Sequence, residues 1–188
     1  MAASDGAETY TVTFLEMTAP PRGAPPPRPA EPLALMAAPE PPLHFFMYLY
    51  RTVGADYQWT DLLAWEPERL AAFVQDPLVR LTVLYRAGAP AGFFQLDRRQ
   101  QGACDLAYFG LTPEALGRGI GPWLLWTALQ DAWATAPDPL PPEPVERVTV
   151  NTCTLDHRSA LALYQRMGFA PIRREERRLG EPVWPRPR

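Results

Sequence analysis

A glycine-rich turn between two strongly patterned segments constrains this chain more than any other feature of its sequence. The turn is Leu116-Gly117-Arg118-Gly119-Ile120-Gly121-Pro122-Trp123, with a strand-like run before it and an apolar, helix-like run after it. Glycine has no Cβ atom to hold other groups away from the backbone, and it allows positive φ angles. The pattern therefore predicts a strand, a tight turn that a ligand can approach closely, and a helix that begins at Pro122.

The first turn of such a helix is a favourable place for an anion. Its amide groups have no partners within the helix, and the aligned peptide dipoles place about half a positive charge there. Glycine at 117, 119 and 121 allows a diphosphate to come close, and Arg118 adds a cation beside the turn. The sequence thus predicts a phosphate-binding turn, with a plain glycine-rich connection as the alternative.

Two common phosphate-binding motifs do not fit this turn. A Walker-type loop ends in Gly-Lys-Ser/Thr, and the chain contains no lysine. A dinucleotide fingerprint has the spacing G-x-G-x-x-G, whereas the spacing here is G-x-G-x-G. The sequence therefore excludes both of these nucleotide sites.

The turn resembles the acetyl-CoA pyrophosphate loop of the GNAT superfamily of N-acetyltransferases, whose pattern is Arg/Gln-x-x-Gly-x-Gly/Ala. Leu116 stands at the Arg/Gln position. A second segment, His157 to Phe169, resembles the last helix of the family, Asn-x-x-Ala-x-x-x-Tyr-x-x-x-Gly-Phe, with His157 in place of the asparagine. Two motifs in the correct order, separated by a helix and a strand, identify the chain as similar to this superfamily over about residues 78–178.

The resemblance implies an α/β fold, an α+β mixed sheet that is mostly antiparallel and flanked by helices. Alternating apolar residues independently predict strands, and apolar residues at helical spacing predict helices. The expected strands are 10–17, 78–86, 91–97, 104–111, 146–153 and 170–178, with 33–36 and Val183-Trp184 as uncertain additions. The expected helices are 43–49, 61–65, 67–75, 122–134 and 159–167.

The domain organisation that we expect is a single domain with two less regular ends. Residues 1–42 supply a first strand and a proline-rich surface connection, and prolines from 20 to 42 favour extended coil there. Residues 43–178 form the GNAT acetyltransferase core, and residues 179–188 form a tail of proline and arginine. A ligand for a proline-recognition domain is the alternative role of the proline-rich segment.

Composition excludes several classes of function. The net charge of −3 and a pI near 5.4 give no basic field for nucleic acid or an anionic membrane. Two histidines and two cysteines stand in no metal-ligand spacing, so no metal is expected. No run approaches the length of a membrane span, and no signal peptide is recognisable at the start. A cytoplasmic monomer or homodimer is the expectation.

By resemblance, Tyr164 lies near the sulfur of acetyl-CoA and protonates it, while Asp105 accepts a proton from the amine. Under strict alternation Asp105 shares one strand face with Ala107 and Phe109. Core packing of Tyr164 and a polar strand start at Asp105 are the structural alternatives. The implied cofactor-binding residues are Phe109, Gly110, Leu111, Leu116, Gly117, Arg118, Gly119, Ile120, Gly121, Pro122, Asn151 and His157.

Three of these residues carry a further interpretation. Glycine inside a strand pattern predicts a bulge or the close approach of another segment, and this applies to Gly110. Asn151 is expected to bond pantetheine amides, and His157 to cap the last helix. Purely structural roles for both are the alternatives.

For the acceptor, the resemblance points to the segment that follows the first strands. Arg51, Asp56, Tyr57 and Trp59 are the candidate substrate-binding residues. Asp56 or Asp61 could attract a cationic amine, and Arg51 could attract a carboxylate. The implied reaction is acetyl transfer from acetyl-CoA to an amine of a small molecule or peptide, by direct attack and without a metal. Transfer of a longer acyl group and a non-catalytic acyl-CoA-binding module are the two alternatives. Cys153 as an acyl-accepting nucleophile is weakly supported, because only His157 lies near it in sequence.

Overall fold

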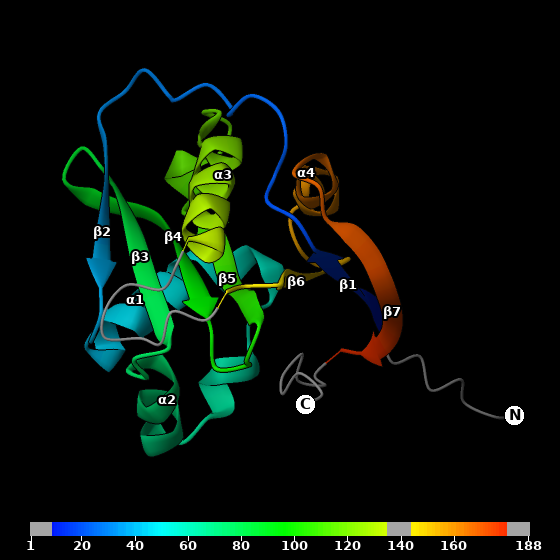
Figure 1. The fold of residues 1–188 in the computed structure, drawn as a ribbon. Helices are drawn as coiled ribbons and strands as arrows, with labels where there is room; N and C mark the ends of the chain where they lie inside the picture. The colour runs from blue at the N-terminus through cyan, green and yellow to red at the C-terminus, as the bar shows by residue number, and fades with distance from the viewer. Residues whose placement is uncertain (1–8, 135–143, 180–188) are drawn as a thin grey trace, which may run out of the picture.

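A seven-stranded sheet with helices on both faces makes up residues 9–134 and 144–179, the part of the chain that the computed structural model describes (Figure 1). The strands are β1 Thr9–Met17, β2 Leu33–Ala38, β3 Val79–Arg86, β4 Ala89–Asp97, β5 Ala103–Leu111, β6 Arg147–Cys153 and β7 Ala170–Arg178. The α-helices are α1 Leu43–Gly54, α2 Pro67–Val74, α3 Ile120–Trp133 and α4 Ala160–Arg166. Short 3-10 turns occur at η1 Ala55–Tyr57, η2 Asp61–Ala64 and η3 Pro113–Ala115.

The strand order is β2-β3-β4-β5-β6-β1-β7, and β5 and β6 form the one parallel pair among the described strands. This arrangement confirms the expected mixed, mostly antiparallel sheet. The strand and helix ranges agree with the sequence-based ranges to within a few residues, with two exceptions. The first helix continues to Gly54, and the expected helix 61–65 is the short 3-10 turn η2. Val183 and Trp184 lie outside the described residues.

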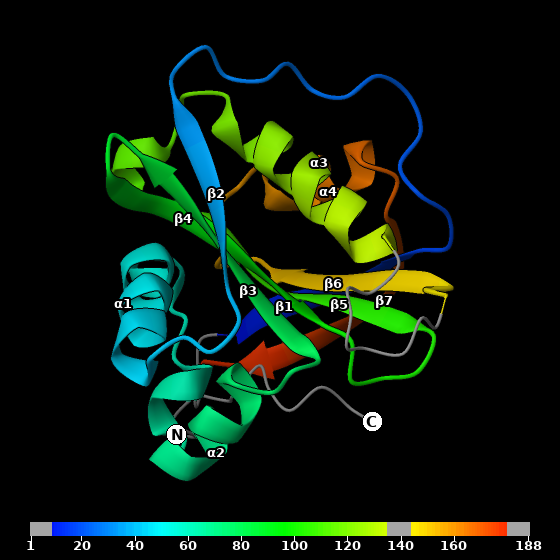
Figure 2. The same cartoon turned by 60° about the vertical axis from the view of Figure 1, so that its left-hand side comes forward.

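Two hydrophobic clusters cover the two faces of the sheet. Alternation along a strand sends successive side chains to opposite faces, so Val148 and Val150 of β6 enter one cluster and Thr149 does not. That cluster contains the buried residues of α3 and α4, while the other contains those of α1 and α2. Figure 2 shows the two helix pairs on opposite sides of the strands.

Helix α3 is apolar on most of its surface, and it packs against the sheet. Its fully buried residues include Leu124, Leu125 and Leu129, and its tryptophans pack around the same cluster. The proline-rich segment 18–32 contains no helix or strand and passes over the α3 side of the sheet (Figures 1 and 2). The Arg28 guanidinium lies 5.9 Å from the centre of the Trp123 ring.

Strand β1 does not lie at the edge of the sheet, as a first strand often does, but between β6 and β7. It pairs with both neighbours in antiparallel fashion, for example Leu15 with Val150 and Thr13 with Arg174. In the described part of the chain, β1 is therefore an inner strand, and only β7 lies beyond it on this side of the sheet. β7 is the edge strand, as its charged sequence predicts.

Candidate functional site

An opening between β5 and β6 is the first element of the site. The two strands pair only through Ala103/Arg147, Cys104/Val148 and Asp105/Thr149, and beyond these positions they are no longer paired with each other. Backbone groups on the β5 side of this opening therefore do not bond to β6. Such an edge can form hydrogen bonds with an extended ligand that enters between the strands.

A register shift in β5 changes which side chains face the opening. Gln95 pairs with Tyr108 and Leu96 pairs with Leu106, so Ala107 is an extra residue in β5. Ala107 consequently packs with the α1 cluster, whereas Phe109 packs with the α3 cluster. The expected strict alternation, which placed Asp105, Ala107 and Phe109 on one face, is therefore wrong because the bulge inverts the pattern.

The glycine turn leads into α3 two residues earlier than expected. The helix begins at Ile120 with Gly119 as its N-cap, so Pro122 lies inside the first turn rather than opening the helix. No side chain caps this end of the helix. The amides of Gly119, Ile120 and Gly121 are among those without a partner in the helix, whereas Pro122 has no N–H to offer.

Two of the three glycines are required by backbone conformation. Gly117 and Gly119 have φ angles of +72° and +73°, which side chains with a Cβ rarely adopt. A Cβ at either position would meet no atom within 4 Å, so the space above the turn is open. Gly121 is helical, and a Cβ there would lie 3.8 Å from Leu111 Cδ1, which is an ordinary contact.

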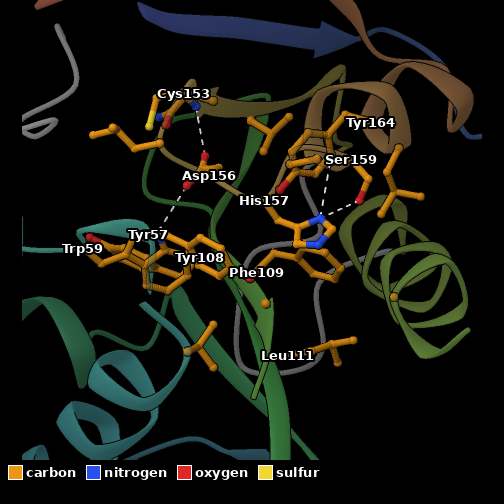
Figure 3. A pocket seen from close by; sticks show the side chains of 18 of the residues that line it. Tyr57, Trp59, Tyr108, Phe109, Leu111, Cys153, Asp156, His157, Ser159 and Tyr164 are labelled. Atoms are coloured by element: carbon orange, nitrogen blue, oxygen red, sulfur yellow. Dashed lines mark hydrogen bonds between the residues drawn. The ribbon is translucent and has the colours of Figure 1, made fainter. Parts of the chain in front are cut away.

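A cavity of about 390 Å³ joins the glycine turn, the opening between β5 and β6, and α4 (Figure 3). The predicted cofactor-binding residues that line it are Phe109, Gly110, Leu111, Leu116, Gly117, Gly119, Ile120, Gly121, Pro122, Asn151 and His157. Arg118 is not part of the lining, and its Nε donates a hydrogen bond to the Glu114 carbonyl at 3.0 Å. The structure thus brings the two sequence motifs together around one space.

Gly110 lies where α1 crosses β5 most closely. A Cβ at this position would stand 2.3 Å from Val53 Cγ1, which is far inside van der Waals contact. The prediction of a close approach at Gly110 is therefore confirmed, and the bulge lies three residues earlier at Ala107.

Tyr164 is buried in α4 and lines the cavity. Its ring stands 6.3 Å from that of Phe109 at an interplanar angle of 64°. Burial, and secondarily the charge of Asp156, raises the pKa of its phenol above the ordinary value, so the hydroxyl stays protonated. Within the described residues this hydroxyl has no hydrogen-bond partner, which leaves it available to a ligand in the cavity.

His157 lies in the turn before α4, three residues ahead of its first residue, Ala160, and the N-cap position of the helix is Ser159 rather than His157. Its Nδ1 accepts a hydrogen bond from the Ser159 amide at 3.3 Å and lies 2.8 Å from Ser159 Oγ. Its carbonyl accepts from the Ala160 amide at 2.8 Å. The imidazole also faces Tyr57, with ring centres 6.3 Å apart.

Asp105 lies at the closed end of the opening and is not part of the cavity lining. Its Oδ1 accepts a hydrogen bond of 2.6 Å from the Thr149 hydroxyl, at the last paired position of β5 and β6. The structure therefore gives Asp105 a contact that joins the two strands where they begin to diverge.

The acceptor candidates divide into two groups. Tyr57 and Trp59 line the cavity, whereas Arg51 and Asp56 are exposed and do not. Trp59 lies against Gly54, where a Cβ would stand 2.4 Å from Trp59 Cβ, and its Nε1 donates to Asp156 Oδ1 at 3.4 Å. Figure 3 shows Tyr57, Trp59 and Tyr108 on the same side of the cavity.

Sequence reasoning missed Tyr108 and Asp156, which also line the cavity. Asp156 Oδ2 accepts from the Cys153 amide at 2.9 Å and from the Thr152 hydroxyl at 2.7 Å, a local turn contact that aspartate commonly makes. An aspartate shortly before a helix was the available signal for Asp156. No sequence signal marked the bulge at Ala107, directly after which Tyr108 lines the cavity.

The two cysteines differ in position. Cys104 is buried, as expected of a core thiol, but Cys153 is only partly buried and lines the cavity. Burial, followed by the charge of Asp156, raises the pKa of the Cys153 thiol to about 11, so it is a poor nucleophile near neutral pH. No group of metal-ligating side chains occurs within residues 9–134 and 144–179, and none of the helices described there is long and apolar enough to span a membrane.

Comparison with protein families gives a match to the model described as "Acetyltransferase (GNAT) family", over residues 44–169. No protein with a curated description matches the chain. The matched range contains the glycine turn, both sides of the opening and α4.

Solved structures of similar fold include two described as GCN5-related N-acetyltransferases. The one from Kribbella flavida has 16% identity and a TM-score of 0.56, and the match covers 86% of this chain and 54% of that one. The one from Sphaerobacter thermophilus has 18% identity and a TM-score of 0.55, with coverage of 90% and 52%. A functionally unknown conserved protein from Staphylococcus epidermidis ATCC 12228 has 11% identity, a TM-score of 0.55 and coverage of 91% and 61%. The chain thus spans 52% to 61% of the length of these three proteins.

Proposed function

The chain belongs to the GNAT family of acetyltransferases, and from this premise we propose that it transfers the acetyl group of acetyl-CoA to the amine of a small molecule or peptide. The observation that carries the proposal is the single cavity that connects the glycine turn with the opening between β5 and β6. A diphosphate site and a slot for an extended chain must be continuous if one ligand is to occupy both. The two described N-acetyltransferases of similar fold support this assignment.

The residues of the cavity fit the successive parts of acyl-CoA. Gly119, Ile120 and Gly121 line the cavity at the start of α3, and their amides, which have no partner within the helix, suit the diphosphate. The β5 backbone at Phe109, Gly110 and Leu111, beyond its last pairing with β6, suits the amide-containing pantetheine arm. Asn151 and His157, on the other side of the opening, would flank the same arm.

The chemistry requires a neutral amine and a stabilised leaving sulfur. An alkyl amine has a pKa near 10.4, so less than about a thousandth of it is neutral at pH 7. Direct attack on the thioester carbonyl forms the C–N bond and breaks the C–S bond, and the sulfur then takes a proton. The protonated phenol of Tyr164, free of hydrogen-bond partners within the described residues, is a group in the lining that can donate to this sulfur.

Asp105 as the proton acceptor remains a prediction with less support than Tyr164. Its carboxylate contacts Thr149 and lies outside the lining, so it reaches the amine only through another group. Its position at the last paired residues favours a role in holding the closed end of the opening.

The experiment that tests the proposal measures two events separately. Titration calorimetry with acetyl-CoA reports binding, and release of free CoA with a panel of amines reports transfer. Binding together with amine-dependent release is the expected result. Binding without release under any amine would favour a non-catalytic acyl-CoA-binding module, and faster release from longer acyl-CoAs would favour the longer-chain alternative. Absence of binding would contradict the proposal.

The remaining expectations are proposals of the same kind. The placement of β1 between β6 and β7 supports the proposal that residues 1–178 act as one domain. A cytoplasmic location and a monomer or homodimer are proposed from the sequence alone. The test of the assembly is the molar mass of the purified protein in solution.

A further inference from the structure

One end of the cavity holds a carboxylate between aromatic rings. Asp61, at the start of η2, lines the cavity beside Trp59 and Tyr108. The Tyr108 hydroxyl donates to Asp61 Oδ2 at 2.7 Å, and the Tyr50 hydroxyl donates to Asp61 Oδ1. Both hydroxyls are protonated donors because burial, with the charge of Asp61, raises the pKa of each phenol. The two contacts fix the orientation of the carboxylate.

The charge of this carboxylate is not neutralised within the described residues. Neutral phenols donate to it, but no described arginine forms an ion pair with it. A carboxylate has about four acceptor positions, and the phenols occupy two of them. Asp61 therefore keeps both a net negative charge and the capacity to accept from a ligand.

Other charged residues along the cavity add to the negative charge of Asp61. Asp156 also lines the cavity, where it accepts hydrogen bonds from the Trp59 indole and from the turn before α4. The arginine found in the described lining is Arg166, which belongs to α4, and Arg51 is exposed and outside the lining. A positive group is consequently favoured at the Asp61 end, and a negative group is disfavoured.

The walls around Asp61 are aromatic. The Tyr108 ring lies 5.4 Å from both the Tyr50 and the Trp59 rings, and the Tyr50 and Trp59 rings are 5.6 Å apart. The side chains of Trp59 and Tyr108 face the cavity together with Tyr57 (Figure 3). Aromatic faces attract cations as well as flat apolar groups.

We propose that this end of the cavity binds the acceptor, and that the acceptor is an amine with an apolar body and no carboxylate next to the nitrogen. Asp61 binds this amine in its protonated form, and the amine loses that proton before it attacks the thioester. The inference rests on the proposed function, because the donor then occupies the glycine turn and the opening. Amino acids and other acceptors with a neighbouring carboxylate are disfavoured, since that carboxylate would lie near Asp61 and Asp156.

The test uses phenethylamine and phenylalanine, which share a body and differ in one carboxylate. Calorimetry first measures acetyl-CoA binding to the wild-type protein, and then the binding of each probe to the protein saturated with CoA. The expected result is that phenethylamine binds at least about tenfold more tightly than phenylalanine. This comparison requires no variant and is independent of turnover.

Asp61→Asn then tests the residue itself, with Glu68→Gln as the matched control on an exposed carboxylate of α2 outside the lining. Asp61→Asn should weaken phenethylamine binding by about tenfold to a hundredfold and remove the preference over phenylalanine. Its affinity for acetyl-CoA should be unchanged, and Glu68→Gln should match the wild type in every measurement.

The two hypotheses fail in different ways. Loss of acetyl-CoA binding by the wild-type protein would contradict the proposed function. Normal acetyl-CoA binding with no preference for phenethylamine, including no binding of either probe, would overturn the acceptor class. An unchanged preference in Asp61→Asn would overturn the role of that carboxylate.

Discussion

The phenol of Tyr164 combines burial with a free hydroxyl, and this combination separates a reacting tyrosine from a packing one. Tyr164→Phe removes the hydroxyl and leaves the ring against Phe109. We expect kcat to fall by at least about a hundredfold, because a general acid contributes about 10² to 10⁴ in rate. The melting temperature and the acetyl-CoA dissociation constant should change little, since the hydroxyl has no partner within the described residues.

Tyr85→Phe is the matched control, because Tyr85 is a partly buried tyrosine that does not line the cavity. It should leave kcat unchanged. Equal kcat values in Tyr164→Phe and the wild type would show that Tyr164 has only a packing role and is not the general acid.

Single residues also show how far the sequence predicts the site. The motif positions from Leu116 to Pro122, except Arg118, and the downstream Tyr164 line one cavity, because local spacing specifies a turn and a helix face. The role of Asp105 comes from the resemblance, and its shared strand face with Phe109 was predicted from strict alternation, which the extra residue Ala107 breaks. Asp61 and Tyr108 are 47 positions apart, so their hydrogen bond has no local signal in the sequence.

At the scale of elements, the contact between α1 and β5 sets the wall of the cavity. Gly110→Ala would place a Cβ 2.3 Å from Val53 Cγ1, so one of the two elements must move. We expect the free energy of unfolding to fall by about 1–3 kcal/mol, the usual effect of overpacking. Chemical denaturation measures this change.

The double variant Gly110→Ala/Val53→Ala provides the control, because the remaining Val53 Cβ would lie 3.7 Å from the added methyl. It should be more stable than the sum of the two single changes predicts. Strict additivity would show that α1 and β5 are not in the close contact described here.

Element boundaries were predicted well where a periodic pattern continues and less well where two signals overlap. The meander β3, β4 and β5 follows from alternation and turn residues. The start of α3 was placed at Pro122 because proline favours the first helical turn, but proline is tolerated throughout that turn, and the helix begins at Ile120. The early start is what leaves Gly119 as the N-cap, with its positive φ.

At the scale of the whole molecule, β1 pairs the N-terminal part of the sheet with the C-terminal strands. It lies between β6 and β7, and its Tyr10 lines the cavity. Leu15 of β1 is 1% exposed and belongs to the α3 cluster, so Leu15→Ala should lower the free energy of unfolding by about 2–5 kcal/mol. Thermal and chemical denaturation measure the effect.

Met36→Ala is the control, because Met36 of β2 is 59% exposed and should change stability by no more than about 0.5 kcal/mol. A small effect of Leu15→Ala would mean that β1 is not a constituent of the core. The sequence predicted β1 itself but not its neighbours, because pairing between residues about 140 positions apart depends on the sheet as a whole.

The central claim is that the glycine turn and the opening between β5 and β6 together bind acyl-CoA. The most direct test is calorimetry of acetyl-CoA with Gly119→Glu, and with Gly88→Glu as a control in the turn between β3 and β4. Both glycines have positive φ, +73° and +81°, and open space at the Cβ position, so the backbone strain of the two variants is matched. A glutamate at 119 blocks the turn and repels a diphosphate, by about 3 kcal/mol at 5–6 Å separation and an effective dielectric constant near 20. We expect Gly119→Glu to lose at least about a hundredfold in acetyl-CoA affinity while Gly88→Glu binds as the wild type does; wild-type affinity in Gly119→Glu would contradict the claim.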